Sequence, residues 1–197
     1  LKKIYYRYIK NLDELESKKM NSIGDTCGIV INYKTPDLIK KYLADFRYYY
    51  PDLHLLIVDN SNFDRSTDII YSICKKDGNM TLLANFFNLH HGPGLHKAIQ
   101  YIENYFKFAL IMDSDIQFHS YGMLEELKRI VPENFICCGK IEEVSERGMN
   151  TKEQTIIPYI HPSCMYLNVK EYLKLLPAKL HGAPFIDTFK NVKEKGL

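Results

Sequence analysis

Two carboxylates separated by one residue follow the apolar run 108–112, in the tripeptide Asp113-Ser114-Asp115. Carboxylate oxygens are ligands that Mg²⁺ and Mn²⁺ prefer, and these cations commonly complete their coordination with water and phosphate oxygens. Two such charges side by side would repel each other unless a cation bound between them. We therefore expect Asp113 and Asp115 to bind Mn²⁺ or Mg²⁺. The alternative is a solvated turn in which Asp115 caps a following helix.

Three further polar stretches also follow apolar runs and could belong to the same site: 32–34, 59–61 and 88–96. In the last of them, Gly92 and Gly94 would let a ligand approach the backbone closely, and a helix that begins there would favour negative charge at its N-terminus. His90 and His91 could face a phosphate or a sugar hydroxyl, although a histidine in an exposed loop is more often a bystander. Asp59 lies at the end of a predicted strand, where an Asp can simply stabilise the turn that follows.

These polar stretches must be positioned by the apolar runs that precede them. Short apolar runs rich in β-branched residues predict strands at 27–33, 53–58, 81–84 and 108–112, and helical spacing predicts helices from 37 onward and up to about 106. Thr35 is expected to cap the first of these helices and Pro36 to open it. Strands that alternate with helices indicate a mostly parallel open sheet flanked by helices, in which the loops after the strands line one cleft.

The remaining segments have weaker patterns. We expect a helix at 121–130, a strand and turn at 134–143, two strands at 156–160 and 164–168, and a short helix at 169–176. Residues 1–20 have the spacing of a helix with one apolar stripe. That helix either packs on the domain or offers a basic, aromatic surface to a membrane.

Composition excludes several classes of protein. The 197 residues suffice for one sizeable core, and 26 Lys and Arg are balanced by 24 Asp and Glu, so no nucleic-acid-binding surface is expected. Most of the five cysteines lie in apolar runs, which is typical of buried thiols in a cytosolic protein. The sequence has no apolar stretch of about 20 residues and no signal-peptide pattern. We expect a cytoplasmic protein, with contact to the inner face of a membrane as an open alternative.

The order of these motifs resembles that of the family 2 glycosyltransferases of bacterial type, which have the GT-A fold. Residues 29–36 (IVINYKTP) are similar to the opening strand and loop of the family, 57–61 (IVDNS) with 66–68 (STD) to its second-strand motif, and 110–115 (LIMDSD) to its metal-binding signature. The resemblance implies an α/β, Rossmann-like GT-A sheet with a smaller acceptor-side region at the C-terminus. It implies a single domain at 27–197 after an N-terminal helical extension at 1–26.

Within that domain, the resemblance assigns 27–115 to the nucleotide-sugar-binding half and 116–197 to the acceptor half. It implies that Asp59 contacts the nucleoside, that the backbone after Asn32 cradles the base, and that Asp113 and Asp115 touch ribose and metal. In the 88–96 stretch, His90 and His96 replace residues that are commonly Gly and Asn in the family. The expected donor-binding residues are Asn32, Tyr33, Lys34, Asp59, Asn60, Asn88, Gly92, His96, Asp113 and Ser114.

The acceptor half carries a looser resemblance, at residues 161–168 and 181–187. An inverting transfer needs a base near the acceptor hydroxyl, and Asp187 is our candidate, although it could instead cap a terminal helix. Glu142 and Glu143 are weaker candidates for the base. A third metal ligand could come from a histidine, and we rank His181 above His161 because Gly182 beside it allows close approach.

The resulting hypothesis is a metal-dependent glycosyltransferase that moves a sugar from a nucleotide-diphosphate donor to a saccharide or lipid-linked acceptor, with inversion, in polysaccharide or glycoconjugate synthesis. One alternative is a sugar-phosphate nucleotidyltransferase. That enzyme normally has a glycine-rich basic loop after the first strand, where this chain reads NYKTP at 32–36. A second alternative is a nucleotide-sugar-binding module without catalytic activity.

Overall fold

The computed structural model describes residues 24–145, 148, 156–179 and 182–196. They contain a six-stranded sheet in the order β3-β2-β1-β4-β6-β5. β1 pairs in parallel with β2 and β4, β2 pairs in parallel with β3, and β6 runs antiparallel to both β4 and β5. This mixed, mostly parallel sheet confirms the predicted fold class. The strands are β1 (Thr26–Asn32), β2 (His54–Asp59), β3 (Met80–Ala84), β4 (Phe108–Asp113), β5 (Cys137–Val144) and β6 (Ile157–Asn168).

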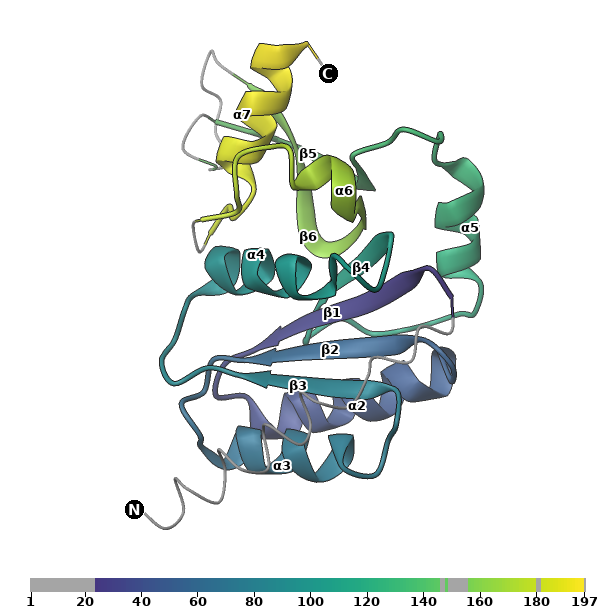
Figure 1. The fold of residues 1–197 in the computed structure, drawn as a ribbon, viewed down its shortest axis with the longest axis vertical. Helices are drawn as coiled ribbons and strands as arrows, with labels where there is room; N and C mark the ends of the chain where they lie inside the picture. Colours follow the sequence, from purple (N-terminus) through teal and green to yellow (C-terminus); the bar gives the residue numbers. More distant parts are fainter. Residues whose placement is uncertain (1–23, 146–147, 149–155, 180–181, 197) are drawn as a thin grey trace.

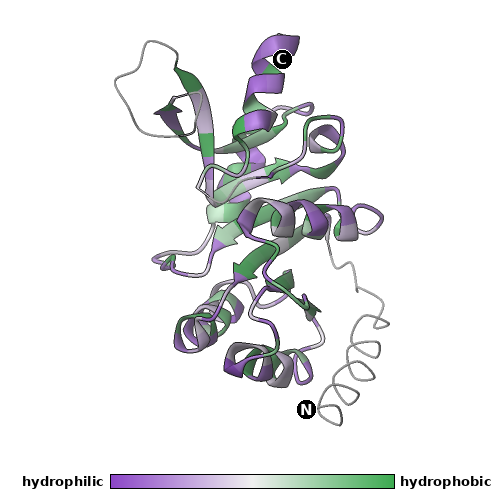
Figure 2. Cartoon of the chain, turned by 90° about the vertical axis from the view of Figure 1, so that its left-hand side faces the viewer, coloured by the Kyte–Doolittle hydropathy of each residue, from purple (hydrophilic) through white to green (hydrophobic). Residues whose placement is uncertain are grey.

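Helices cover both faces of the sheet. In Figure 1, α2 and α3 lie below the sheet, α4 lies above it together with α6 and α7, and α5 lies at the right-hand side. Figure 2 shows that the strands are largely hydrophobic, whereas the helices carry hydrophilic residues on their outer sides. The helices are α2 (Pro36–Tyr49), α3 (Arg65–Cys74), α4 (His91–Ile102), α5 (Met123–Ile130), α6 (Val169–Tyr172) and α7 (Ile186–Lys195).

Both faces of β1 are buried. Successive side chains of a strand point to opposite sides, so neighbouring residues of β1 pack in two different clusters. Ile29 packs in a cluster with Leu95 of α4, whereas Val30 packs in a second cluster with Phe46 of α2, and each of these residues is 0% exposed. Gly28 leaves room for that second cluster, since a Cβ there would lie 2.9 Å from the ring of Phe46. A strand buried on both sides reads as a continuous apolar run, which is why the sequence predicted it.

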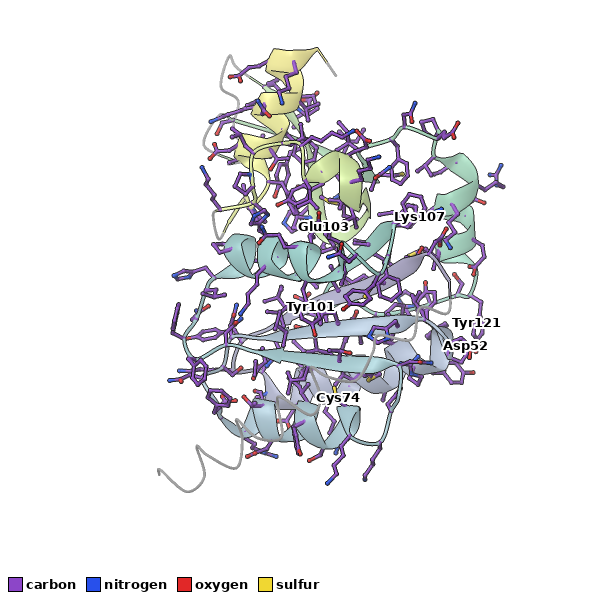
Figure 3. The ribbon with its side chains drawn as sticks, viewed as in Figure 1. Asp52, Cys74, Tyr101, Glu103, Lys107 and Tyr121 are labelled. Carbon is purple, nitrogen blue, oxygen red and sulfur yellow. The ribbon has the colours of Figure 1, made fainter. Side chains whose placement is uncertain are left out.

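The five cysteines all lie in the described part of the chain and are free thiols. Cys27 and Cys74 are fully buried, and Cys74, labelled in Figure 3, lies on α3 below the sheet. Burial raises the pKa of the Cys27 thiol, so this group is a packing residue rather than a nucleophile.

Two predicted strands proved to be one. The sequence pattern predicted two separate strands, at 156–160 and 164–168. The structure instead has the continuous strand β6, and the register of β6 against β5 shifts between Gly139 and Ile141. Pro162 lies beside this irregularity, where no pairing with β5 requires its missing N–H.

Helix boundaries also differ from the prediction. α4 begins at His91, so Gly92 and Gly94 lie in its first turn. The short helix expected at 169–176 ends at Tyr172. Thr35 occupies the N-cap position of α2 without capping it, because its hydroxyl donates to Asn32 Oδ1 instead, at 2.7 Å.

The helix predicted at 1–20 lies outside the described residues. Among the residues that the structure describes, no helix is long and apolar enough to cross a bilayer.

Burial of His54 predicts a pH-dependent stability. His54 is 2% exposed, its Nε2 lies 3.0 Å from Thr81 Oγ1, and burial lowers its pKa from 6.5 to about 4. The folded state thus favours the neutral ring. The contribution of the buried neutral His54 to the free energy of unfolding is full above pH 6.5 and is lost as the pH falls toward 4. The shift corresponds to about 3 kcal/mol of unfolding free energy.

Urea denaturation between pH 7 and pH 4 measures this loss. His54→Gln should have a smaller decrease of stability with acidification than the wild type, whereas His119→Gln, at an exposed position, should retain the full decrease. Equal pH dependence in all three proteins would contradict the assignment.

Candidate functional site

A cavity of about 280 Å³ opens at the carboxyl ends of the parallel strands. In Figure 1 this is the left-hand edge of the sheet, toward which the arrowheads of β1, β2 and β3 point. Each of the four polar stretches singled out in the sequence contributes to its wall, which also has an apolar part. The lining residues are Ile31, Tyr33, Thr35, Leu38, Asn60, Asn88, His90, His91, Asp113, Ser114 and Asp115.

The carboxylate pair lies at the end of β4. Asp113 is the last residue of the strand and pairs in register with Ile31 of β1, so the strand itself delivers it to the cavity. Its side chain is 27% exposed, and its Oδ1 lies 3.5 Å from His91 Nε2. Asp115, two residues further along, is exposed. The pair therefore combines one partly buried and one solvent-facing carboxylate.

The electrostatic surroundings of Asp113 favour a cation. Burial raises the pKa of Asp113, the charges of His91 and His161 lower it, and the charge of Asp115 raises it, with a net upward shift. A carboxylate held in this way is costly to keep ionised without a nearby positive charge. His161 on β6 is thus a histidine whose charge acts on Asp113, whereas His181, which we ranked above it, lies outside the described residues.

Asp113 and Asp115 fit a divalent cation as a partial set of ligands. In the described part of the chain, no group of three or more His, Cys, Asp or Glu side chains could hold a metal ion. A Mg²⁺ or Mn²⁺ ion at the carboxylate pair would complete its coordination with water and with oxygens of a bound phosphate. Such a site would bind metal and phosphate ligand together.

Asp59 lies behind the cavity wall and organises it. The residue is 1% exposed, and its Oδ1 accepts hydrogen bonds from Asn32 Nδ2 at 2.8 Å and from Ser61 Oγ at 2.6 Å. Its Oδ2 accepts a hydrogen bond from the hydroxyl of Thr67 on α3. The carboxylate therefore links the ends of β1 and β2 to α3. Direct contact of Asp59 with a nucleoside stays a prediction, and it would require this carboxylate to be uncovered.

The loop after β1 is held by the same network. Asn32 is fully buried and donates from its Nδ2 to Ser61 Oγ at 3.0 Å as well as to Asp59. The backbone N–H of Lys34 also donates to Ser61 Oγ, at 2.8 Å. Tyr33 is 47% exposed and lines the cavity. Tyr33 and Asn32 were both predicted to bind the donor. Tyr33 lines the cavity, whereas the side chain of Asn32 supports the loop through hydrogen bonds.

A second network of amides shapes the opposite loop. Asn60 lines the cavity, and its Nδ2 donates to the carbonyl of His90 at 3.2 Å. Asn85 Nδ2 donates to Asn60 Oδ1 at 2.9 Å, and Lys97 Nζ donates to Asn85 Oδ1 at 2.6 Å. Asn85 and Lys97 were not among the residues predicted for the site. A single Asn after a strand and a Lys in a helix do not by themselves indicate a binding site, because their role depends on contacts with distant parts of the chain.

His96 and Gly92 were predicted to bind the donor but do not line the cavity. His96 Nδ1 lies 3.0 Å from the hydroxyl of Tyr172, so this histidine connects α4 to α6. Gly92 is buried in the first turn of α4. Both residues lie within α4, so their positions around the helix decide what they face.

Asp187, the predicted base, lies in the first turn of α7 and does not line the cavity either. Its side chain is 38% exposed, with Oδ1 4.0 Å from Lys190 Nζ. The N-cap residue of α7 is Phe185, so Asp187 does not cap this helix.

The mixed, mostly parallel six-stranded sheet flanked by helices has the GT-A fold, which it shares with solved glycosyltransferases. The chain belongs to glycosyl transferase family 2, whose family profile matches residues 27–188. No curated protein matches the chain.

Solved structures share the fold at low sequence identity. A mannosyltransferase from Pyrobaculum calidifontis, in complex with GDP-Man and Mn²⁺, has a TM-score of 0.58 at 14% identity over 86% of this chain and 53% of its own. A fragment of S. aureus TarS with UDP-GlcNAc has a TM-score of 0.54 at 14% identity, over 85% of this chain and 54% of its own. Glucosyl-3-phosphoglycerate synthase from Mycobacterium tuberculosis with UDP has a TM-score of 0.56 at 10% identity, over 93% of this chain and 70% of its own. This chain thus spans about half the length of the first two.

Proposed function

We propose that this protein transfers a sugar from a nucleoside-diphosphate donor to an acceptor hydroxyl, with a divalent cation bound at Asp113 and Asp115. The observation that carries the proposal is the cavity at the carboxyl ends of β1, β2 and β4, whose wall combines a carboxylate pair with amide and imidazole groups. Membership of glycosyl transferase family 2 supports the reaction class. Neighbours solved with GDP-Man and Mn²⁺, or with UDP-GlcNAc, support the choice of ligands.

Each part of the cavity has a proposed role. Ile31, Tyr33 and Leu38 provide an apolar wall, with one aromatic face, for the base of the donor. Asn60 and Asn88 offer amide groups to ribose or sugar hydroxyls. A bound Mn²⁺ or Mg²⁺ would neutralise charge that develops on the departing nucleoside diphosphate. Asp113, Ser114 and Asp115 would hold that end of the donor in place.

We also propose inversion at the anomeric carbon, with Asp187 as the base. A base must lie within hydrogen-bonding reach of the acceptor hydroxyl, and Asp187 does not line the donor cavity, so the acceptor would have to lie between that cavity and α7. Asp187→Asn is expected to lower turnover by about 100-fold or more while it leaves donor binding unchanged. A variant with normal turnover would reject Asp187 as the base.

The acceptor is proposed to be a saccharide or a lipid-linked saccharide, in polysaccharide or glycoconjugate synthesis at the cytoplasmic face of a membrane. We keep the division into a donor half at 27–115 and an acceptor half at 116–197 as part of this proposal.

Incubation of the full chain with a panel of nucleotide sugars and Mn²⁺ tests the function. Release of nucleoside diphosphate, which EDTA abolishes, would support the transfer reaction. Release of pyrophosphate from a nucleoside triphosphate and a sugar phosphate would indicate nucleotidyl transfer instead. Donor binding without turnover, with every acceptor tried, would indicate a binding module.

A further inference from the structure

His90 has a backbone conformation that is unusual for a residue with a side chain. Its φ is 65° and its ψ is 176°, immediately before the first turn of α4. This region of φ and ψ is occupied almost only by glycine, because the Cβ of other residues meets the backbone there. A residue persists in such a conformation only when surrounding contacts impose it, and such positions cluster at functional sites.

The contacts that impose this conformation come from the cavity wall. The backbone N–H of His90 donates to Asn88 Oδ1 at 2.7 Å, and its carbonyl accepts from Asn60 Nδ2 at 3.2 Å. Asn85 fixes Asn60 in turn. Three asparagine side chains thus hold one backbone turn, and both Asn60 and Asn88 line the cavity themselves.

His90 lines the same cavity as Asp113 and Asp115. A cation at the carboxylate pair can bind only some of the oxygens of a diphosphate. The remaining oxygens carry negative charge and need N–H donors, which imidazole can supply.

We propose that His90 binds the donor through its diphosphate, and that this contact is the reason for its strained backbone. The inference rests on the proposed function, because it concerns the same cavity and the same donor. It assigns to His90 a phosphate-binding role that would apply to every nucleoside-diphosphate donor.

His90→Gly tests the inference through two measurements that should change in opposite directions. Glycine relieves the backbone strain, so the melting temperature should rise by roughly 2–4 °C. Loss of the imidazole should weaken binding of UDP, GDP and pyrophosphate, each measured by calorimetry with Mn²⁺, by about tenfold or more. Binding of the free nucleosides, which have no phosphate, should not change. A residue with only a structural role would not produce a more stable protein that binds phosphate less well.

Asn62→Gly is the matched control. Asn62 also has a positive φ, of 57°, and its side chain does not line the cavity. This variant should bind nucleoside diphosphates and pyrophosphate as the wild type does.

The possible failures are distinguishable. If the wild type binds UDP or GDP and His90→Gly binds them equally well, the role of His90 is rejected and the proposed function stands. If the wild type binds no nucleoside diphosphate and turns over no nucleotide sugar, the proposed function itself is rejected. A His90→Gly protein that is less stable than the wild type would reject the strain argument.

Discussion

Asp115→Ala is expected to abolish Mn²⁺-dependent binding of the nucleotide-sugar donor. Asp115 is exposed, two residues from the last residue of β4, and it lines the cavity together with Asp113. Its loss leaves a cation with a single carboxylate, so the affinity for metal and donor together should fall by about 100-fold or more. Since the side chain is exposed, the stability of the fold should change by no more than about 0.5 kcal/mol.

Titration of donor with Mn²⁺ and with EDTA measures the effect. In the wild type, EDTA should weaken donor binding strongly; in Asp115→Ala, the two titrations should give the same weak affinity. Glu103→Ala is a matched control, since Glu103 is an exposed carboxylate at the opposite end of α4 from the cavity (Figure 3). Donor affinity of the wild type that is identical with and without EDTA would refute a metal site at the carboxylate pair.

Asp59→Ala is expected to have the largest effect on stability. The substitution removes the acceptor of hydrogen bonds from Asn32, Ser61 and Thr67, all at most 1% exposed. An unsatisfied buried donor costs about 1–3 kcal/mol, so we expect a loss of about 3–5 kcal/mol of unfolding free energy in total. Donor affinity should also fall, because the loops after β1 and β2 lose their connection.

Urea denaturation measures this loss, and Asp64→Ala is the control within the same loop. Asp64 caps α3 by accepting from the backbone N–H of Ser66 at 2.7 Å, so its replacement should cost only about 1 kcal/mol. If Asp59→Ala binds donor poorly but is as stable as the wild type, a direct nucleoside contact of Asp59 would be favoured over the positioning role.

Local sequence patterns were sufficient to predict the parallel part of the sheet and the edge of the sheet at which the site lies. Strands β1 to β4 are short apolar runs that end in a polar residue or are followed by one, and each predicted bound lies within one residue of the observed bound. Because strands joined through helices pair in parallel, their carboxyl ends meet at one edge of the sheet. That rule alone brought Tyr33, Asn60, Asn88 and Asp113 to one cavity.

The orientation of individual side chains was not determined by such patterns. His96 was expected to face the donor, and its actual partner is Tyr172, which lies 76 positions further along the chain. Two strands were expected at 156–160 and 164–168, and pairing with β4 and β5 made them one continuous strand, β6.

The sequence by itself therefore determined which residues reach the carboxyl edge of the sheet, because apolar periodicity and the chemistry of strand ends are local properties. Only the tertiary structure decided which of them open onto the cavity and which support it. Asp59 and Asp113 both end a strand, but Asp59 is enclosed by hydrogen bonds from β1 and α3, whereas Asp113 remains partly exposed beside His91. Hydrogen-bond saturation of a buried carboxylate depends on partners that are distant in the chain, and no local pattern encodes them.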